Sequence, residues 1–189
     1  MNLSKLSICA ALSVLSLSIH TKAEEASEAA APPKVRQVSE SGIRHSFLVT
    51  GSKMTAIFNE DSKVIWSVNG SSRDGTVLPD GNILICEGKR VVEYRKGTQD
   101  IVWSYKLDPK NKEVAAAWRL DGGNTLVVEN GVAPRLIEVT PAGELAVNFP
   151  LQPETDNIHM QSRMARKLPN GNYLVPHLLA FAVKEYTPT

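Results

Sequence analysis

One phrase occurs three times along the chain, as Val77–Ile85 (VLPDGNILI), Arg119–Val127 (RLDGGNTLV) and Lys167–Val175 (KLPNGNYLV). In each copy a leucine leads into a glycine-containing turn, and an apolar run follows the turn, as in a strand, a tight turn and a second strand. Glycine at these turns suits the positive φ that tight hairpins require. The phrase therefore predicts an antiparallel hairpin that recurs along the chain.

Further strands follow each copy of the phrase. The phrase asparagines, Asn82, Asn124 and Asn172, are 42 and 48 residues apart. Third strands are expected at 90–94 (RVVEY), 135–139 (RLIEV) and 181–186 (FAVKEY), and fourth strands at 100–105 (DIVWSY) and 145–149 (LAVNF). Four short antiparallel strands in roughly 40–50 residues are typical of one β-propeller blade. We therefore predict an all-β chain, a β-propeller of four-stranded antiparallel blades. The competing β-sandwich would not repeat one hairpin phrase at near-constant spacing.

The predicted blades occupy about 45–70, 73–106, 113–151 and 161–189. The first lacks an obvious innermost strand, because the stretch before it, Val38–Ile43, is polar, and the last stops after its third strand. The domain 45–189 is thus expected to hold about three and a half blades, with closure incomplete. We expect a fragment of a longer protein or a chain that pairs with another one, and open sheet edges make self-association possible.

The N-terminal residues 1–23 have the features of a secretory signal peptide. Lys5 precedes the apolar stretch Leu6–Ile19, and Thr21-Lys22-Ala23 forms a small-residue cleavage site. We expect export to the periplasm or the extracellular space, without stable membrane insertion after cleavage, the alternative being an uncleaved anchor. Residues 24–44, which begin with EEASEAAAPP, are predicted to be a flexible low-complexity linker.

Charge and cysteine content exclude several functions. The chain has 21 Lys and Arg against 20 Asp and Glu, and without Lys5 and Lys22 the balance is 19 against 20, a net charge of −1. Nucleic-acid binding needs a basic stripe that this chain lacks, so we expect no nucleic-acid partner. Cleavage would remove Cys9 and leave Cys86 alone, as a buried small hydrophobe without a disulfide.

The repeat resembles the propellers of pyrroloquinoline-quinone (PQQ) dehydrogenases and of bacterial arylsulfotransferases. The segment Gly97-Thr98-Gln99-Asp100-Ile101-Val102-Trp103 is similar to the quinoprotein motif, in which a glycine precedes a strand that carries a docking tryptophan. The Ala-x-Asp that leads this motif in the dehydrogenases is absent, and the histidines of the arylsulfotransferase site do not align. The resemblance therefore implies an architecture over 45–189 and no cofactor site, and the cofactor stays unknown. Trp66 and Trp103 are expected to pack between blades.

Polar residues recur where the first strand of each blade begins and the second ends. Both positions lie on one face of a propeller, at the mouth of its central funnel, and loops on such a rigid scaffold commonly carry ligand sites. Thr50 and Glu113 also fall at such positions. The candidate ligand-binding residues are Arg73, Asp74, Glu87, Glu129, His159, Gln161, Arg163 and His177.

Three interpretations of this set stay open. The charges can pair with one another around a solvated funnel. They can bind a small molecule, a glycan or a protein partner, with Arg73 and Arg163 gripping a carboxylate or sulfate. Alternatively, His159 and His177 can hold a metal with Glu87 or Glu129, although no short ligand spacing supports this.

No Walker loop, nucleophile elbow or dinucleotide fingerprint occurs in the chain. The sequence therefore favours an exported binding or interaction scaffold. The alternative is a propeller enzyme, a quinone-dependent dehydrogenase or a sulfotransferase-like protein, with part of its site in missing blades.

Overall fold

The computed structural model describes residues 38–188. The predicted signal peptide, 1–23, and the first part of the predicted linker, 24–37, lie outside the described residues.

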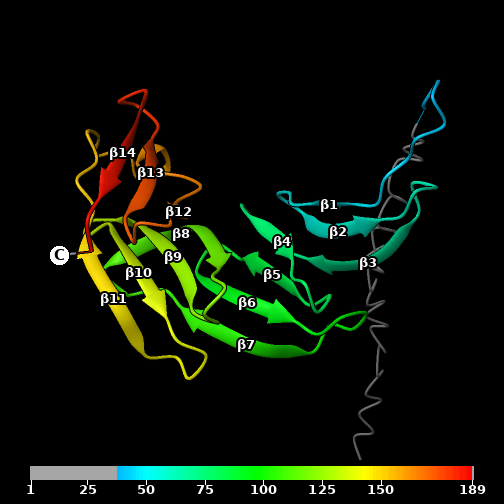
Figure 1. Ribbon diagram of the computed structural model, residues 1–189, viewed down its shortest axis with the longest axis horizontal. Coiled ribbons are helices and arrows are strands. Elements are labelled where there is room, and N and C mark those ends of the chain that lie inside the picture. Colours follow the sequence, from blue (N-terminus) through cyan, green and yellow to red (C-terminus); the bar gives the residue numbers. More distant parts are fainter. Residues whose placement is uncertain (1–37, 189) are drawn as a thin grey trace, which may run out of the picture. The chain divides into compact units, whose positions relative to one another are not determined.

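Within residues 38–188, fourteen strands form four antiparallel sheets in chain order (Figure 1). The first sheet contains β1 (Phe47–Val49), β2 (Met54–Phe58) and β3 (Val64–Asn69). The second contains β4 (Gly75–Val77), β5 (Ile83–Cys86), β6 (Arg90–Tyr94) and β7 (Ile101–Lys106). The third contains β8 (Asn111–Arg119), β9 (Thr125–Gly131), β10 (Arg135–Val139) and β11 (Leu145–Pro150). A 3₁₀ turn, η1 (Ile158–Met160), precedes the fourth, which contains β12 (Arg166–Lys167), β13 (Tyr173–His177) and β14 (Ala182–Tyr186).

The repeated phrase forms the hairpin that the sequence predicts. It joins β4 to β5, β8 to β9 and β12 to β13. At the three turns, Gly81, Gly123 and Gly171 have φ values of 88°, 89° and 90°, a region that favours glycine. The asparagine of each phrase donates a side-chain hydrogen bond to a glutamate in the third strand of the same sheet. The pairs are Asn82 with Glu93, Asn124 with Glu138 and Asn172 with Glu185.

The two terminal sheets are incomplete at opposite edges. An irregularity in the pairing of third and fourth strands occurs at Glu93/Tyr94 in the second sheet, at Glu138/Val139 in the third and at Ile57/Phe58 in the first. The strands β1, β2 and β3 therefore correspond to the second, third and fourth strands of a blade, and residues 38–188 contain no first strand for this sheet. The last sheet has strands one to three, so the predicted incomplete closure is confirmed.

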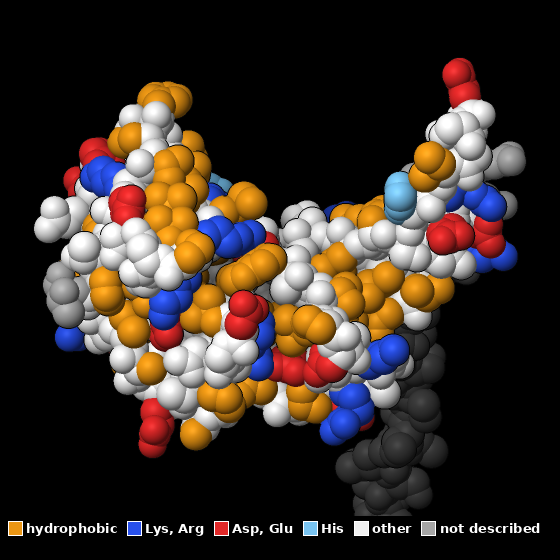
Figure 2. Space-filling view, viewed as in Figure 1, with side chains coloured by type: hydrophobic (Ala, Val, Ile, Leu, Met, Phe, Trp, Pro, Cys, Tyr) orange, Lys and Arg blue, Asp and Glu red, His pale blue; other side chains and the backbone are white. Residues whose placement is uncertain are grey.

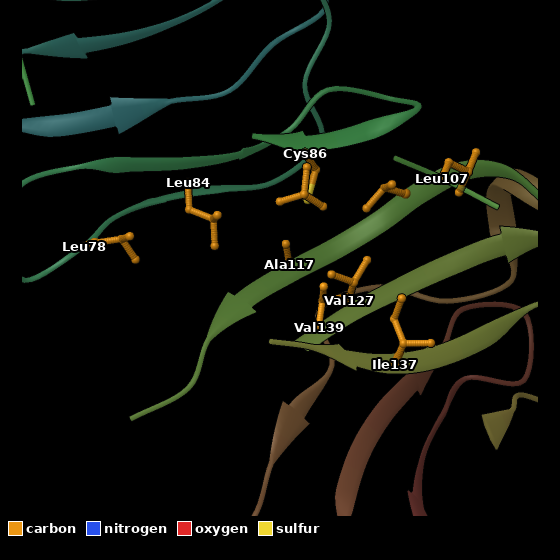
Figure 3. Close-up of a cluster of buried hydrophobic side chains, with 10 residues drawn as sticks. Leu78, Leu84, Cys86, Leu107, Ala117, Val127, Ile137 and Val139 are labelled. Atoms are coloured by element: carbon orange, nitrogen blue, oxygen red, sulfur yellow. The ribbon is translucent and has the colours of Figure 1, made fainter. Parts of the chain in front are cut away.

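Apolar side chains fill the space between successive sheets. Leu78, Leu84 and Cys86 of the second sheet pack against Ala117, Val127, Ile137 and Val139 of the third (Figure 3). A similar cluster joins the first sheet to the second, and another joins the third to the fourth. Strands such as β5 and β9 are buried along their whole length because each of their faces meets a neighbouring sheet.

An ion pair bridges each of the last two sheet interfaces. Arg119, at the end of β8, binds Glu93 of the preceding sheet at 2.6 Å, and Lys167 of β12 binds Glu138 at 2.6 Å. At the interface between the first and second sheets, the equivalent positions hold the apolar residues Ile57 and Val77. The phrase thus supplies both the turn and one side of the inter-sheet contact.

Candidate functional site

Four polar side chains from three separate segments converge at the strand ends opposite the hairpin turns. We call Arg73, Glu113, His159 and Arg163 the arginine cluster. Arg73 lies just before β4 and Glu113 lies in β8, whereas His159 belongs to η1 and Arg163 follows it. Three of the four are among the eight predicted candidates, and Glu113 was expected on the same face.

Arg73 is the centre of the cluster. Its guanidinium binds a carboxylate oxygen of Glu113 at 2.7 Å. The same guanidinium contacts the His159 ring, with 2.6 Å from Nη2 to Nδ1 and 3.3 Å from Nη1 to Nε2. The His159 side chain is 58% exposed, so this edge of the cluster is open to solvent.

Arg163 approaches Glu113 from its other side. Its Nη1 lies 3.6 Å from Glu113 Oε1, and its guanidinium donates to the backbone oxygens of Ser162 at 2.8 Å and His159 at 2.7 Å. Burial and the positive charge of Arg73 lower the pKa of Arg163. Glu113 Oε1 is itself buried without a hydrogen-bond partner. Two guanidinium groups thus share one carboxylate, which leaves an excess of positive charge that suits an anion.

Asp74 is adjacent in sequence but has a different environment. Its carboxylate accepts hydrogen bonds from the backbone N–H groups of Gly75 at 2.9 Å and Ala117 at 3.4 Å. Burial raises its pKa, although these hydrogen bonds and Arg166 act in the opposite direction. Asp74 therefore links the first strands of the second and third sheets.

The other four candidates are held by internal partners. Glu87 pairs with Arg90 and accepts a hydrogen bond from Tyr94. Glu129 is completely buried. Gln161 forms two hydrogen bonds with the backbone of Gly131, at 2.9 and 3.0 Å. His177 is buried between Glu154 and Tyr186, and burial lowers its pKa.

The partners of Glu129 come from three elements. Its carboxylate accepts hydrogen bonds from Tyr105 at 2.7 Å, Asn111 at 2.8 Å and Arg135 at 2.8 Å, and from the backbone N–H of Asp108 at 3.0 Å. Sequence reasoning did not find this network, since spacing alone does not indicate that Tyr105 reaches across from the second sheet.

A groove of about 680 Å³ lies at the opposite ends of the strands, between the hairpin turns of the second and third sheets. Its lining includes Pro79, Asp80, Trp118 and Asp121. The guanidinium of Arg166 stacks on the Trp118 ring, 4.0 Å from the ring centroid. The sequence analysis did not single out this groove.

The metal interpretation has no support in the described structure. Among residues 38–188, no three His, Cys, Asp or Glu side chains are grouped closely enough to hold a metal ion. His159 contacts Arg73, whereas His177 is enclosed by Glu154 and Tyr186. No helix within the same residues is long and apolar enough to cross a membrane.

Comparison with known proteins identifies the fold. No family model and no curated protein matches the chain. A protein of unknown function from Bacteroides caccae is 25% identical, with a TM-score of 0.68 over 77% of this chain and 55% of that one. A catalytically inactive virginiamycin B lyase from Staphylococcus aureus, solved with quinupristin, is 12% identical, with a TM-score of 0.50 over 81% of this chain and 59% of that one.

The chain thus spans between 55% and 59% of the length of these two structures. The predicted all-β propeller fold with incomplete closure is confirmed by these likenesses and by the four antiparallel sheets. At 12% identity, the similarity to the lyase concerns the fold.

Proposed function

We propose that this chain is an exported propeller scaffold that binds a small anionic group at the arginine cluster. The observation that supports this most is the convergence of Arg73 and Arg163, 90 residues apart, on the single carboxylate of Glu113. One carboxylate neutralises one guanidinium, so the other charge is available to a ligand.

The chemistry of the cluster favours a carboxylate or a sulfate. A guanidinium presents its N–H donors in a planar fork that matches two oxygens of such groups. The His159 side chain beside Arg73 is 58% exposed, so a ligand can reach the cluster from this edge. The ligand class is therefore an acidic or sulfated small molecule, glycan or peptide.

We also place the repeats with the quinoprotein type, on the strength of Gly97–Trp103. In the structure Trp103 lies in β7 and packs against the core between the second and third sheets, with the Arg119 guanidinium 5.4 Å from its ring centroid. This supports the docking role that the motif gives to its tryptophan, and it assigns an architecture without a reaction.

The binding proposal can be tested by titration with sodium sulfate and sodium acetate. Guanidinium NMR signals of Arg73 and Arg163 should shift saturably with either anion. Arg163→Ala should weaken binding about tenfold or more, because a hydrogen bond to a charged group contributes about 1.5–3 kcal/mol. The matched control is Arg44→Ala, which removes an exposed arginine paired with Asp61 away from the cluster. Equal losses in both variants, or no saturable shift, would contradict the proposal.

A further inference from the structure

Three lysines line a second groove, which lies at the same strand ends as the arginine cluster. This groove has a volume of about 670 Å³ and is found where β7 ends and β8 begins. Lys89 comes from the turn between β5 and β6, Lys106 ends β7, and Lys112 lies in β8. All three residues are exposed. We call this feature the lysine groove.

Backbone hydrogen bonds hold the three lysine-bearing segments together. The N–H of Leu107, just after β7, donates to the carbonyl oxygen of Lys89 at 3.0 Å. The N–H of Val114 in β8 donates to the carbonyl oxygen of Gly88 at 2.7 Å. The turn between β5 and β6 is therefore fixed against both β7 and β8, which brings the three lysines to one groove.

A bulge in β8 carries Lys112. Asn111 and Glu113 pair with consecutive residues of β9 in reverse order, so Lys112 has no partner in that register. A bulge of this kind redirects a side chain and is common beside functional sites. Because Glu113 belongs to the arginine cluster, this one bulged strand supplies a residue to each of the two sites.

The less exposed lining residues form the floor of the lysine groove. Tyr105, Asn111 and Arg135 line it, and each donates to the carboxylate of the buried Glu129. Arg135 uses Nε for Glu129 and Nη2 for the Tyr105 hydroxyl at 3.0 Å. No hydrogen bond within residues 38–188 uses Arg135 Nη1, so this nitrogen is available to a ligand. A floor fixed in this way does not have to be ordered when a ligand binds.

The carboxylates around the lysine groove already have partners. Asp108 and Glu129 bind Arg135, and Glu87 binds Arg90. Among residues 38–188, the ion pairs include none of the three lysines. On the face seen in Figure 2, acidic and basic side chains are otherwise interspersed. The groove is therefore a local excess of positive charge on a chain that is nearly neutral overall.

We propose that the lysine groove binds a short polyanion, a ligand that carries two or more phosphate or sulfate groups. Each lysine offers a compact point charge on a flexible stem, a form in which lysine commonly binds phosphate. Three such charges around one groove match several anionic groups, and Arg135 Nη1 adds a donor at the floor. The volume of the groove is in the range of small-molecule sites. This site uses none of the residues of the arginine cluster, so it stands whether or not that cluster binds a ligand.

Isothermal titration calorimetry with sodium tripolyphosphate and with sucrose octasulfate tests the proposal. At low salt we expect saturable binding of at least one of these polyanions, and weaker binding as salt is added, because exposed charges are screened. Tighter binding of tripolyphosphate would identify a phosphate ligand, and tighter binding of the octasulfate a sulfated saccharide. Similar affinities would show that the number of charges decides binding.

Lysine substitutions show where the polyanion binds. Lys106→Ala and Lys112→Ala should each weaken binding about threefold or more, and the double variant about tenfold or more, since each change removes one ammonium group. The matched control is Lys63→Ala, which removes an exposed lysine from the turn between β2 and β3 and should leave the affinity unchanged. Because all three lysines are exposed, circular dichroism should show the wild-type fold in every variant.

The lysine groove and the arginine cluster are tested separately. Acetate binding at the arginine cluster should be the same in the double lysine variant as in the wild type. No saturable binding of either polyanion, or equal losses in Lys63→Ala and in the groove variants, would overturn the proposal. Polyanion binding that is lost in Arg163→Ala and kept in the double lysine variant would also overturn it, since the arginine cluster would then be the site.

Discussion

At the scale of single residues, Glu129 illustrates how this fold accommodates a charge in its interior. The side chain is completely buried, yet each carboxylate oxygen accepts hydrogen bonds, from Tyr105, Asn111, Arg135 and a backbone N–H. The Arg135 guanidinium at 2.8 Å also neutralises the charge. Buried carboxylates persist only when they are paired and hydrogen-bonded in this way, so we assign Glu129 a structural role.

Replacing Glu129 by alanine should therefore be strongly destabilising. The change leaves Arg135 and the Tyr105 hydroxyl without their main acceptor, and loss of one partner of a buried pair costs about 3–5 kcal/mol. Asp61→Ala is the control, because the side chains of Asp61 and its partner Arg44 are 54% and 48% exposed and the expected loss is about 1 kcal/mol or less. Urea unfolding followed by circular dichroism measures both values. Similar losses in the two variants would show that the Glu129 network is not important for stability.

The sequence predicted part of the candidate site. Repeat positions correctly indicated that Arg73, Glu113 and Arg163 come to one face, because the hairpin phrase fixes which strand ends lie together. They could not show that Glu87 and His177 turn toward tyrosines of their own sheets, since spacing does not determine side-chain direction. The ion pairs between sheets could have been predicted from the sequence. A glutamate recurs in RVVEY, RLIEV and FAVKEY, and a basic residue, Arg119 or Lys167, begins two of the three phrases.

At the scale of elements, the tryptophans of the fourth strands join one sheet to the next. Trp66 of β3 is 8% exposed, packs edge-to-face on Tyr94 and donates to the backbone oxygen of Thr98 at 2.5 Å. Trp103 occupies the equivalent position in β7 and is partly buried. The sequence-based interpretation of both as packing residues agrees with this geometry, because the equivalent strands face equivalent neighbours.

The loss of stability on truncating each tryptophan should increase with the burial of its side chain. Trp66→Ala should cost about 3–5 kcal/mol, as expected for a large aromatic removed from a core. Trp103→Ala should cost less, since its ring is partly exposed. Trp118→Ala removes an indole of the same size that is 37% exposed on the first strand of the third sheet, and it should cost least. Chemical denaturation of the three variants gives the ranking, and a large loss from Trp118 with a small one from Trp66 would contradict it.

The interface between the third and fourth sheets should respond to alkaline pH. Burial and Glu138 raise the pKa of Tyr173 to about 12, and the hydrogen bond to Glu138 raises the pKa of Lys167. Tyrosine in an unfolded chain has a pKa of about 10. The folded state thus retains a proton that the unfolded state loses, so the stability present below about pH 10 declines as the pH rises toward 12.

Tyr173→Phe should make this alkaline decline shallower. Phenylalanine has no proton to lose, so the share of the decline that comes from Tyr173 disappears, whereas the shares from Tyr94, Tyr105 and Lys167 remain. The free energy of unfolding measured from neutral pH to about pH 11.5 tests this. Parallel curves for the variant and the wild type would show that the proton on Tyr173 is not linked to folding.

At the scale of the whole molecule, the described chain is a series of sheets in which each contacts its neighbours in sequence. In such arrays stability is approximately the sum of the terms for each unit and for each interface. Among residues 38–188, the second and third sheets each lie between two neighbouring sheets, whereas the first and last each pack on one. The terminal sheets should therefore open locally at lower free energy than the central ones.

Hydrogen exchange measures this gradient. Amides of β5 and β9, which are buried along their full length, should exchange slowest, because each of these strands lies between two neighbouring sheets. Amides of β14, in which three of five residues are exposed, should exchange much faster. Equal protection of β9 and β14 would mean that the described sheets open together, as one cooperative unit.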